Sequence, residues 1–221
     1  MESRLPKKIV IRDKQWFEKF HWFNTSDGKL VISGRDATQN EILIKKYVDS
    51  VDIVLHGDVH GSPFSVIKNG KDSNDEEKKE AAIFTICHSK AWQNKRVESV
   101  YWIEPEQVSK KAPTGESIAR GGFMIYGKKN YIKDVELKLG VGVQLDPFKV
   151  ISGPIDNIRR KAKYYAVLIP GDKNKDKIAK EIKEFILSVA REEHKELLTK
   201  LNVEEIKEHS IEKSDIFGMV G

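Results

Sequence analysis

The order of extended and helical segments is the feature of this sequence that most constrains its fold. Short apolar runs bounded by turn residues predict strands at residues 30–32, 52–56, 64–68, 97–103, 123–126, 135–145 and 163–169. Helical patterns interrupt this series at irregular intervals, so the spacing is not that of a repeating β–α–β unit. We therefore expect an α+β fold with a mixed, largely antiparallel sheet flanked by helices, in which the runs at 52–56 and 64–68 lie next to each other.

Two helix starts carry capping signals, and the C-terminal part carries a helical period. Asp36 is followed three residues later by Gln39, and Asn74 by Glu77, which is the spacing of a capping box. Apolar residues then recur almost continuously with a helical period over residues 178–201. This pattern predicts one long amphipathic C-terminal helix.

The length of 221 residues suits one generous domain, or a domain with an appendage. We expect a basic tail at residues 1–13, the body of the domain at 14–172, and a helical extension of the same unit at 173–221. An aromatic-rich run at residues 16–23 is expected to form a short helix that packs into the core.

Several classes of protein are disfavoured by what the sequence lacks. A single cysteine, Cys87, leaves no disulfide framework within one chain and fits a reducing compartment. The N-terminus has no apolar stretch typical of a signal peptide, and no run of about eighteen apolar residues occurs. The Walker A, GxGxxG, HExxH, GxSxG and CxxC motifs are also absent. We expect a cytoplasmic protein with no membrane partner, no cofactor and no metal.

The basic residues are concentrated in parts of the chain. The formal net charge is only +5, yet residues 107–133 hold six basic residues against a single acidic one, Glu116. Residues 149–183 hold ten basic residues against four acidic ones, whereas residues 192–215 hold eight acidic residues against four basic ones. A loop rich in lysine and glycine can bind phosphate groups, although such lysines can also serve only to solvate the loop.

The sharpest chemical pattern is His56-Gly-Asp58-Val-His60-Gly61. If this segment is extended, His56, Asp58 and His60 point to one face of a strand, where they could contact RNA, hold a divalent ion, or pair an acid with a base. The outer two Cα atoms would then lie about 13 Å apart, which disfavours one shared ion unless a glycine bends the chain. Purely structural polar residues are the remaining alternative.

Eight motifs in order resemble the NFACT-R domain of the NEMF and RqcH family of ribosome quality-control proteins. They are Trp16–Phe23 (WFEKFHWF), Asp27-Gly28, Gly34-Arg35-Asp36 with Asn40-Glu41, His56–Gly61, Ser89–Trp92, Gln107–Lys110, Ala112–Glu116 and Phe123–Asn130. The resemblance covers roughly residues 14–145, and residues 164–172 resemble the archaeal branch. The sequence departs from the family pattern at Gly57, where alanine is usual, and at Ser117-Ile118, which replace Tyr-Leu.

The resemblance implies an RNA-binding module without catalytic activity, which acts on tRNA, on rRNA of the large ribosomal subunit, or on both, in the rescue of stalled ribosomes. Together with the charge pattern, it implies a nucleic-acid-binding site made of Arg35, His56, Asp58, His60, Lys110, Lys111, Arg120, Lys128, Lys129 and Asn130. Family members that extend nascent chains also have an NFACT-N domain, which has no counterpart in this sequence. A separate chain with that domain is therefore a candidate partner.

Two further hypotheses remain from the residues alone. The first is a metal-assisted RNA-processing enzyme that uses His56, Asp58 and His60. The second is a protein-interaction module that uses the C-terminal helix and the acidic residues near it.

Overall fold

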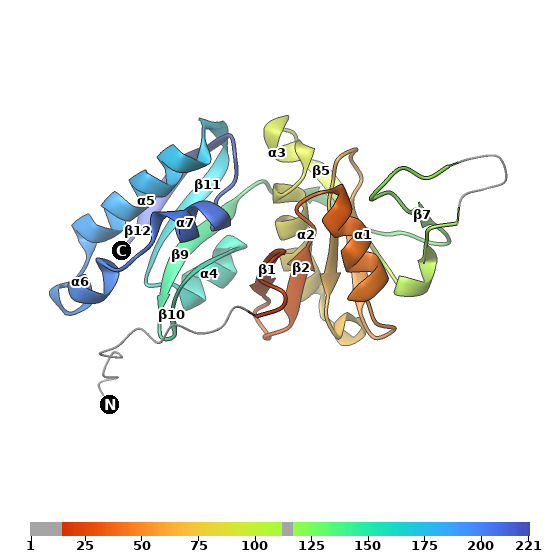
Figure 1. Ribbon diagram of the computed structural model, residues 1–221, viewed down its shortest axis with the longest axis horizontal. Coiled ribbons are helices and arrows are strands. Elements are labelled where there is room, and N and C mark those ends of the chain that lie inside the picture. The colour runs from red at the N-terminus through yellow and green to blue at the C-terminus, as the bar shows by residue number, and fades with distance from the viewer. Residues whose placement is uncertain (1–14, 112–116) are drawn as a thin grey trace. The chain divides into compact units, whose positions relative to one another are not determined.

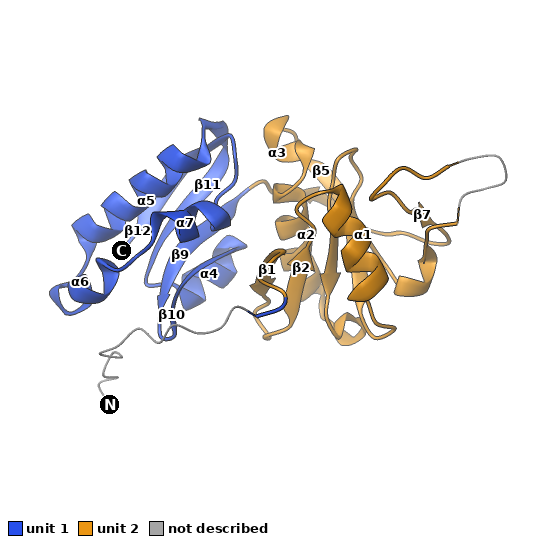
Figure 2. Cartoon of the chain, viewed as in Figure 1, with its two compact units in different colours: residues 1–16, 138–221 blue, residues 17–137 orange. Residues whose placement is uncertain are grey.

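The computed structural model describes residues 15–111 and 117–221, and it divides the chain into two compact units (Figures 1 and 2). We call Phe17–Leu137 the N-terminal unit and Lys138–Gly221 the C-terminal unit. From the sequence we expected a single unit, with its body at residues 14–172 and a helical extension at residues 173–221. The structure differs because the strands after Leu137 pair with one another and build a sheet of their own. The expected basic tail, residues 1–13, lies outside the described residues.

A six-stranded sheet forms the centre of the N-terminal unit, in the order β1-β2-β4-β3-β5-β8. These strands are β1 His21–Asn24, β2 Leu30–Ser33, β3 Ile53–Gly57, β4 Phe64–Ile67, β5 Glu98–Ile103 and β8 Asn130–Val135. All neighbouring pairs are antiparallel. A separate two-stranded pair joins β6, Val108–Ser109, to β7, Met124–Ile125. The α+β class and the antiparallel pairing are therefore confirmed.

Helices cover both faces of this sheet. They are α1 Ala37–Lys46, α2 Asp75–Cys87 and α3 Lys90–Gln93, with two 3₁₀ turns at Gly70–Asp72 (η1) and Pro105–Gln107 (η2). Leu43 of α1 packs against Ile32, Val54 and other side chains on one face. Phe84 of α2 contacts the ring of Phe23, which points to the opposite face, with 4.6 Å between ring centroids. Because side chains alternate along a strand, both faces of the sheet are apolar and buried at its central strands β3 and β4.

The two expected helix starts are present. The Asp36 side chain accepts a hydrogen bond from the backbone N–H of Gln39, and Asn74 and Glu77 form a complete capping box. The Gln39 side chain does not complete a box at Asp36, because it accepts instead from the backbone N–H of Arg35. Both caps fix where the chain leaves a loop and enters a helix.

The expected helix over residues 16–23 is wrong. The chain makes a turn at residues 16–19 and then enters β1 at His21. Trp22 and Phe23 are both buried, on opposite faces of the sheet. A strand satisfies this arrangement because consecutive side chains alternate, whereas a helix would place both residues nearer one side.

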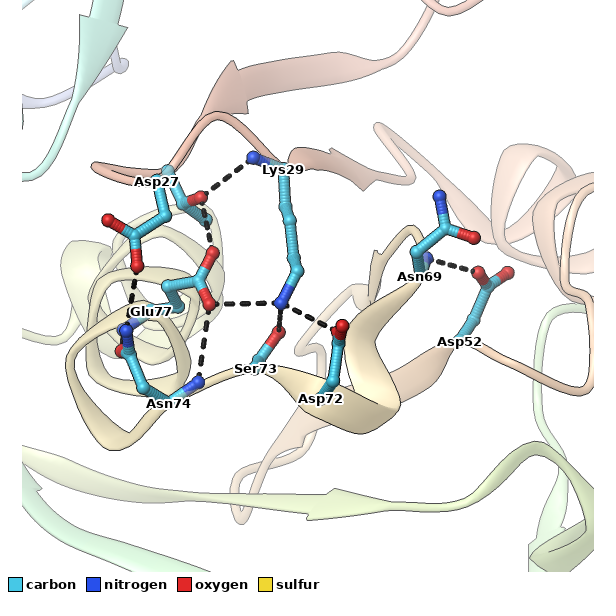
Figure 3. Close-up of polar contacts among 9 residues, drawn as sticks. Asp27, Lys29, Asp52, Asn69, Asp72, Ser73, Asn74 and Glu77 are labelled. Carbon is cyan, nitrogen blue, oxygen red and sulfur yellow. Dashed lines mark hydrogen bonds and ion pairs between the residues drawn. The ribbon is translucent and has the colours of Figure 1, made fainter.

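A polar cluster joins the β1–β2 turn to the start of α2 (Figure 3). Lys29 Nζ lies 3.1 Å from Glu77 Oε2 and 2.8 Å from Asp72 Oδ1. Asn74 Nδ2 donates to Asp27 Oδ2 at 2.8 Å. Burial is the largest single influence on the pKa of Lys29 and lowers it, but the hydrogen bonds to Asp72 and Glu77 and the charges of both carboxylates together raise this pKa. The cluster anchors an edge of the sheet to a helix.

The C-terminal unit is a four-stranded antiparallel sheet with helices, in the strand order β10-β9-β11-β12. Its elements are β9 Leu139–Leu145, β10 Phe148–Gly153, α4 Ile155–Lys161, β11 Tyr164–Lys173, α5 Lys175–Val189, α6 Glu192–Leu198, α7 Val203–His209 and β12 Ser214–Val220. No helix within the described residues is long and apolar enough to cross a membrane.

The long C-terminal helix expected over residues 178–201 is divided in two. Helix α5 ends at Val189 because Ala190 and Arg191 have extended backbone angles. The hydroxyl of buried Tyr164 accepts a hydrogen bond from Arg191 N at 3.1 Å, which holds the break in place. The apolar stripe of α5 is buried within the unit, where the helix packs on β11 and β12. This stripe is therefore not an exposed surface for a protein partner.

Candidate nucleic-acid interface

A cavity of about 450 Å³ lies in the N-terminal unit, on the face of the sheet that α1 covers. It is bounded by the start of α1, the turn between β3 and β4, and the loop before β7. Four of the predicted site residues line it, namely Arg35, His56, His60 and Arg120. The structure thus brings together residues that come from three separate segments of the sequence.

Strand register explains the wall of this cavity. Phe64 of β4 pairs with His56 of β3, and His56 pairs with Tyr101 of β5. Tyr101 in turn pairs with Tyr131 of β8. Paired residues of adjacent antiparallel strands project to the same face, so four rings form a row across four strands. We call Phe64, His56, Tyr101 and Tyr131 the aromatic row; it begins in the buried part of the sheet and ends at Tyr131, which is 47% exposed.

His56 is held in an uncharged state within the row. Its ring centroid lies 4.6 Å from that of Phe64, and its Nδ1 lies 3.3 Å from the hydroxyl of Tyr101. Burial lowers the pKa of His56 to about 4. The hydrogen bond to the Gly57 backbone opposes this shift, as do smaller effects of Ser62 and Asp58, whereas the Lys129 ammonium acts with burial. Burial, followed by the charge of Asp58, raises the pKa of Tyr101 to about 12. Both rings are therefore neutral at neutral pH.

Asp58 and His60 do not continue the strand that carries His56. Strand β3 ends at Gly57, and a turn follows in which both side chains are exposed. His60 lines the cavity, whereas Asp58 is not among the lining residues. The extended arrangement that would place all three side chains on one strand face therefore does not occur, because β3 ends at Gly57 and the chain bends at Asp58. Among the residues that the structure describes, no group of three or more His, Cys, Asp or Glu side chains is placed to hold a metal ion.

The loop before β7 is fastened to α1 at close range. Gly121 has a φ of +75°, and a Cβ atom at this position would lie 2.6 Å from backbone atoms of Ala37. The backbone N–H of Gly121 donates to Glu41 Oε2 at 3.2 Å. This contact requires glycine both for its backbone angle and for its space, and it sets Arg120 beside the cavity.

The side chain of Lys110 holds this loop through hydrogen bonds to its backbone. Its Nζ donates to the carbonyl oxygens of Ala119 and Gly122, each at 3.0 Å, and lies 3.4 Å from Glu41 Oε2. It also lies 5.0 Å from the ring centroid of Phe123. Its donors are thus engaged within the protein, and a direct contact of Lys110 with RNA stays a prediction.

The remaining predicted site residues do not line the cavity. Lys129 Nζ lies 4.3 Å from the centroid of Tyr101, which places its charge against the aromatic row. Asn130 begins β8, and its Nδ2 lies 3.4 Å from the carbonyl oxygen of Trp102. Lys111 and Lys128 are exposed and do not line the cavity. The Ala112–Glu116 motif lies outside the described residues.

Sequence reasoning missed several cavity residues. Asn40 accepts a hydrogen bond from Phe64 N at 3.1 Å through its Oδ1, and so joins α1 to β4. Phe123 packs edge-on against Phe64, with 5.4 Å between ring centroids. Tyr101 was placed in a strand but not in a site. The alternation of side chains along β5 could have assigned Tyr101 to one face of the sheet. Asn40 lies in α1 and Phe123 lies just before β7, so their place at the cavity depends on how these segments pack on the sheet.

Comparison with known proteins identifies related sequences. The family described as NFACT protein RNA binding domain matches residues 19–127, which include the cavity. The archaeal Rqc2 homolog aRqcH of Methanocaldococcus jannaschii is 42% identical over 182 residues, which cover 80% of this chain and 27% of that protein. The ribosome quality control complex subunit NEMF homolog of Drosophila melanogaster is 44% identical over 145 residues, covering 64% of this chain and 15% of that protein. The chain thus spans about a quarter or less of the length of these relatives.

A solved structure also resembles the chain. It is that of the C-terminal part of the fibronectin/fibrinogen-binding protein from Streptococcus suis, with a TM-score of 0.47 and 21% sequence identity. The alignment covers 71% of this chain and 52% of that chain.

Proposed function

Residues 19–127 belong to the NFACT protein RNA-binding domain family, and from this premise we propose that the chain binds RNA through the cavity and the surface next to it. The observation that carries the proposal is that Arg35 and Arg120, which are far apart in the sequence, line the same cavity. Both side chains are exposed, and arginine is well suited to phosphate oxygens because its donors form a planar fork.

The charge around the cavity favours an anionic ligand. Asp36 is the one acidic residue among the described residues that line it. Its carboxylate already accepts a hydrogen bond from the backbone N–H of Gln39 at 2.8 Å, as the cap of α1. Lys129 adds a further positive charge beside the aromatic row. Base-stacking rings next to basic side chains are typical of proteins that bind RNA.

We propose that the RNA is tRNA, rRNA of the large ribosomal subunit, or both, and that the chain acts in ribosome quality control. The relatives named Rqc2 homolog aRqcH and NEMF homolog support this role. The proposed role is one of binding without catalysis, in the cytoplasm. A chain that carries an NFACT-N domain is the proposed protein partner.

Two experiments test this function. Crosslinking in cells, followed by sequencing of the attached RNA, should recover tRNA or large-subunit rRNA above a control without crosslinking. In solution, tRNA affinity should fall with salt, and contact with about three phosphates predicts a log–log slope of roughly −2 to −3. Absence of RNA binding at low salt would contradict the proposal, and so would affinity that does not change with salt.

A further inference from the structure

We propose that the cavity receives one unpaired nucleotide of the RNA, so that the chain prefers RNA with a single-stranded nucleotide over a continuous duplex. This inference rests on the proposed RNA-binding function and specifies the kind of RNA that the site accepts. It concerns the cavity lined by Arg35, His60, Phe64 and Arg120, together with the aromatic row.

The size and chemistry of the cavity fit a nucleotide. Its volume of about 450 Å³ lies within the range of roughly 300–1,000 Å³ that is common for small-molecule sites. The rings of Phe64 and Phe123 meet edge to face, and the His56 ring lies 4.6 Å from that of Phe64. A nucleobase can stack on such rings or meet their edges, which paired and stacked bases inside a duplex cannot do.

The neutral state of the wall suits a base better than a phosphate. His56 is uncharged at neutral pH because burial lowers its pKa to about 4, and its Nδ1 is engaged with the Tyr101 hydroxyl. Both groups can exchange hydrogen bonds with the edge of a base without bringing charge into the cavity. Positive charge lies instead on Arg35 and Arg120, which are exposed. This division places a base inside and its phosphate outside.

Exposed residues surround the mouth of the cavity. Arg35, His60 and Arg120 line the cavity and are all exposed, and Gly61 next to His60 is exposed as well. A base that enters the cavity would leave its ribose and phosphate beside these residues, where arginine can bind phosphate oxygens. The sugar-phosphate chain can therefore stay outside while one base is inside.

The test compares two RNA duplexes with the same number of nucleotides and phosphates. One is fully paired with blunt ends, and the other has fewer base pairs and ends in unpaired 3′ nucleotides. We expect the full chain to bind the second roughly tenfold more tightly, which is within the range for stacking of one base. This comparison needs no variant, so it does not depend on whether a mutant protein folds.

A cavity-filling variant and a matched control locate the effect. Ala119 is exposed and lines the cavity, so Ala119→Trp should fill the cavity without changing any charge. We expect it to lose the roughly tenfold preference while still binding the blunt duplex. Ser117→Trp adds the same side chain to an exposed position of the same loop that is not among the lining residues, and it should keep the preference. Circular dichroism melting would verify that both variants fold.

The outcomes separate this inference from the proposed function. Equal binding of both RNAs, tighter binding of the blunt duplex, or a preference that survives Ala119→Trp would each overturn the unpaired-nucleotide site and leave RNA binding intact. Binding of neither RNA would overturn the proposed function and this inference together. Adenosine monophosphate alone serves as a third ligand, and binding of it as tight as that of the RNA with unpaired ends would show that the site takes free nucleotides instead.

Discussion

The Nζ atom of Lys110 lies 3.4 Å from Oε2 of Glu41 and donates to two carbonyl oxygens of the loop that carries Arg120. The pair joins β6, α1 and this loop beside the cavity. Lys110 was predicted from charge to contact phosphates, yet its ammonium group contacts Glu41, Ala119, Gly122 and Phe123 within the protein. Its effect on RNA binding is therefore expected to come through the position of the loop.

Substitution of Lys110 should loosen this loop. Lys110→Met removes the ammonium that holds the carbonyl oxygens of Ala119 and Gly122. We expect hydrogen exchange of the Gly121 and Gly122 amides to rise by at least roughly tenfold, because the loss of even one of these two charge-assisted hydrogen bonds has about that effect. Lys111→Met, which changes an exposed neighbour, is the matched control and should leave exchange unchanged. Equal exchange in Lys110→Met and the wild type would show that the loop does not depend on this side chain.

Glu41 should titrate far below an ordinary glutamate. The hydrogen bond from Lys45, then that from the backbone of Gly121, and the charge of Lys110 lower the pKa of Glu41 to about 2. Because the folded pKa lies below the unfolded one, these contacts contribute stability above about pH 4.3, and the contribution fades as the pH falls toward the folded pKa. NMR titration of the Glu41 carboxyl carbon measures this directly. A midpoint close to about 4.3 would contradict the three contacts.

The basic turn before β8 should contribute to RNA binding through charge. Lys128→Glu with Lys129→Glu places one negative charge beside the aromatic row and a second at the exposed residue before it, and we expect tRNA affinity to fall by about tenfold or more, with a shallower salt dependence. Fluorescence anisotropy at several salt concentrations measures both effects.

A matched control for this double variant lies in the acidic C-terminal region. Lys195→Glu with Lys200→Glu makes the same change in net charge at two exposed positions of the C-terminal unit. If both double variants weakened binding equally, the loss would reflect net charge alone, and the assignment of Lys128 and Lys129 would fail.

Local features of the fold could be read from the sequence. The pairing of β3 with β4 follows from two apolar runs joined by a short polar corner, and the caps at Asp36 and Asn74 follow from side chains that bond within one turn. Such features depend on residues close together in the chain. The division into two units depends on distant pairings, such as that of β11 with β12, so the sequence did not reveal it.

Contacts between distant residues also explain why the sequence did not predict the break between α5 and α6 or the full arrangement of the candidate site. A helical apolar period runs through Ala190, and the hydroxyl of Tyr164 that bonds Arg191 comes from a distant strand. At the cavity, the family motifs and the charge pattern pointed to Arg35 and Arg120. The contact of Lys110 with Glu41, which changes the expected role of a predicted residue, depends on how a loop returns to α1.

The polar cluster at the start of α2 should contribute strongly to stability (Figure 3). The side chain of Glu77 is only 2% exposed and accepts hydrogen bonds from Thr25 and Lys29. Lys29→Met would leave this buried carboxylate without its cation, and we expect a loss of about 3 kcal/mol in the free energy of unfolding. Lys71→Met removes an equivalent charge that meets Glu104 and Glu106 at exposed positions, and it should cost less than about 1 kcal/mol. If urea unfolding gave equal losses in the free energy of unfolding for Lys29→Met and Lys71→Met, this result would contradict a buried ion pair between Lys29 and Glu77.

His56 should make the N-terminal unit sensitive to mild acid. Its folded pKa of about 4 lies below the ordinary value of 6.5, so the unfolded chain binds the proton first as the pH falls. Stability from the neutral ring is complete above about pH 6.5 and is lost progressively toward the folded pKa, by roughly 2 kcal/mol between about pH 7.5 and about pH 5. His56→Phe keeps an aromatic ring beside Phe64 but cannot titrate, so its free energy of unfolding should fall less over this interval.

Trp22, Trp92 and Trp102 lie in this unit, and their fluorescence during urea unfolding therefore follows it. Parallel pH curves for the two proteins, or an imidazole that titrates near 6.5 in the folded state, would contradict a buried neutral His56.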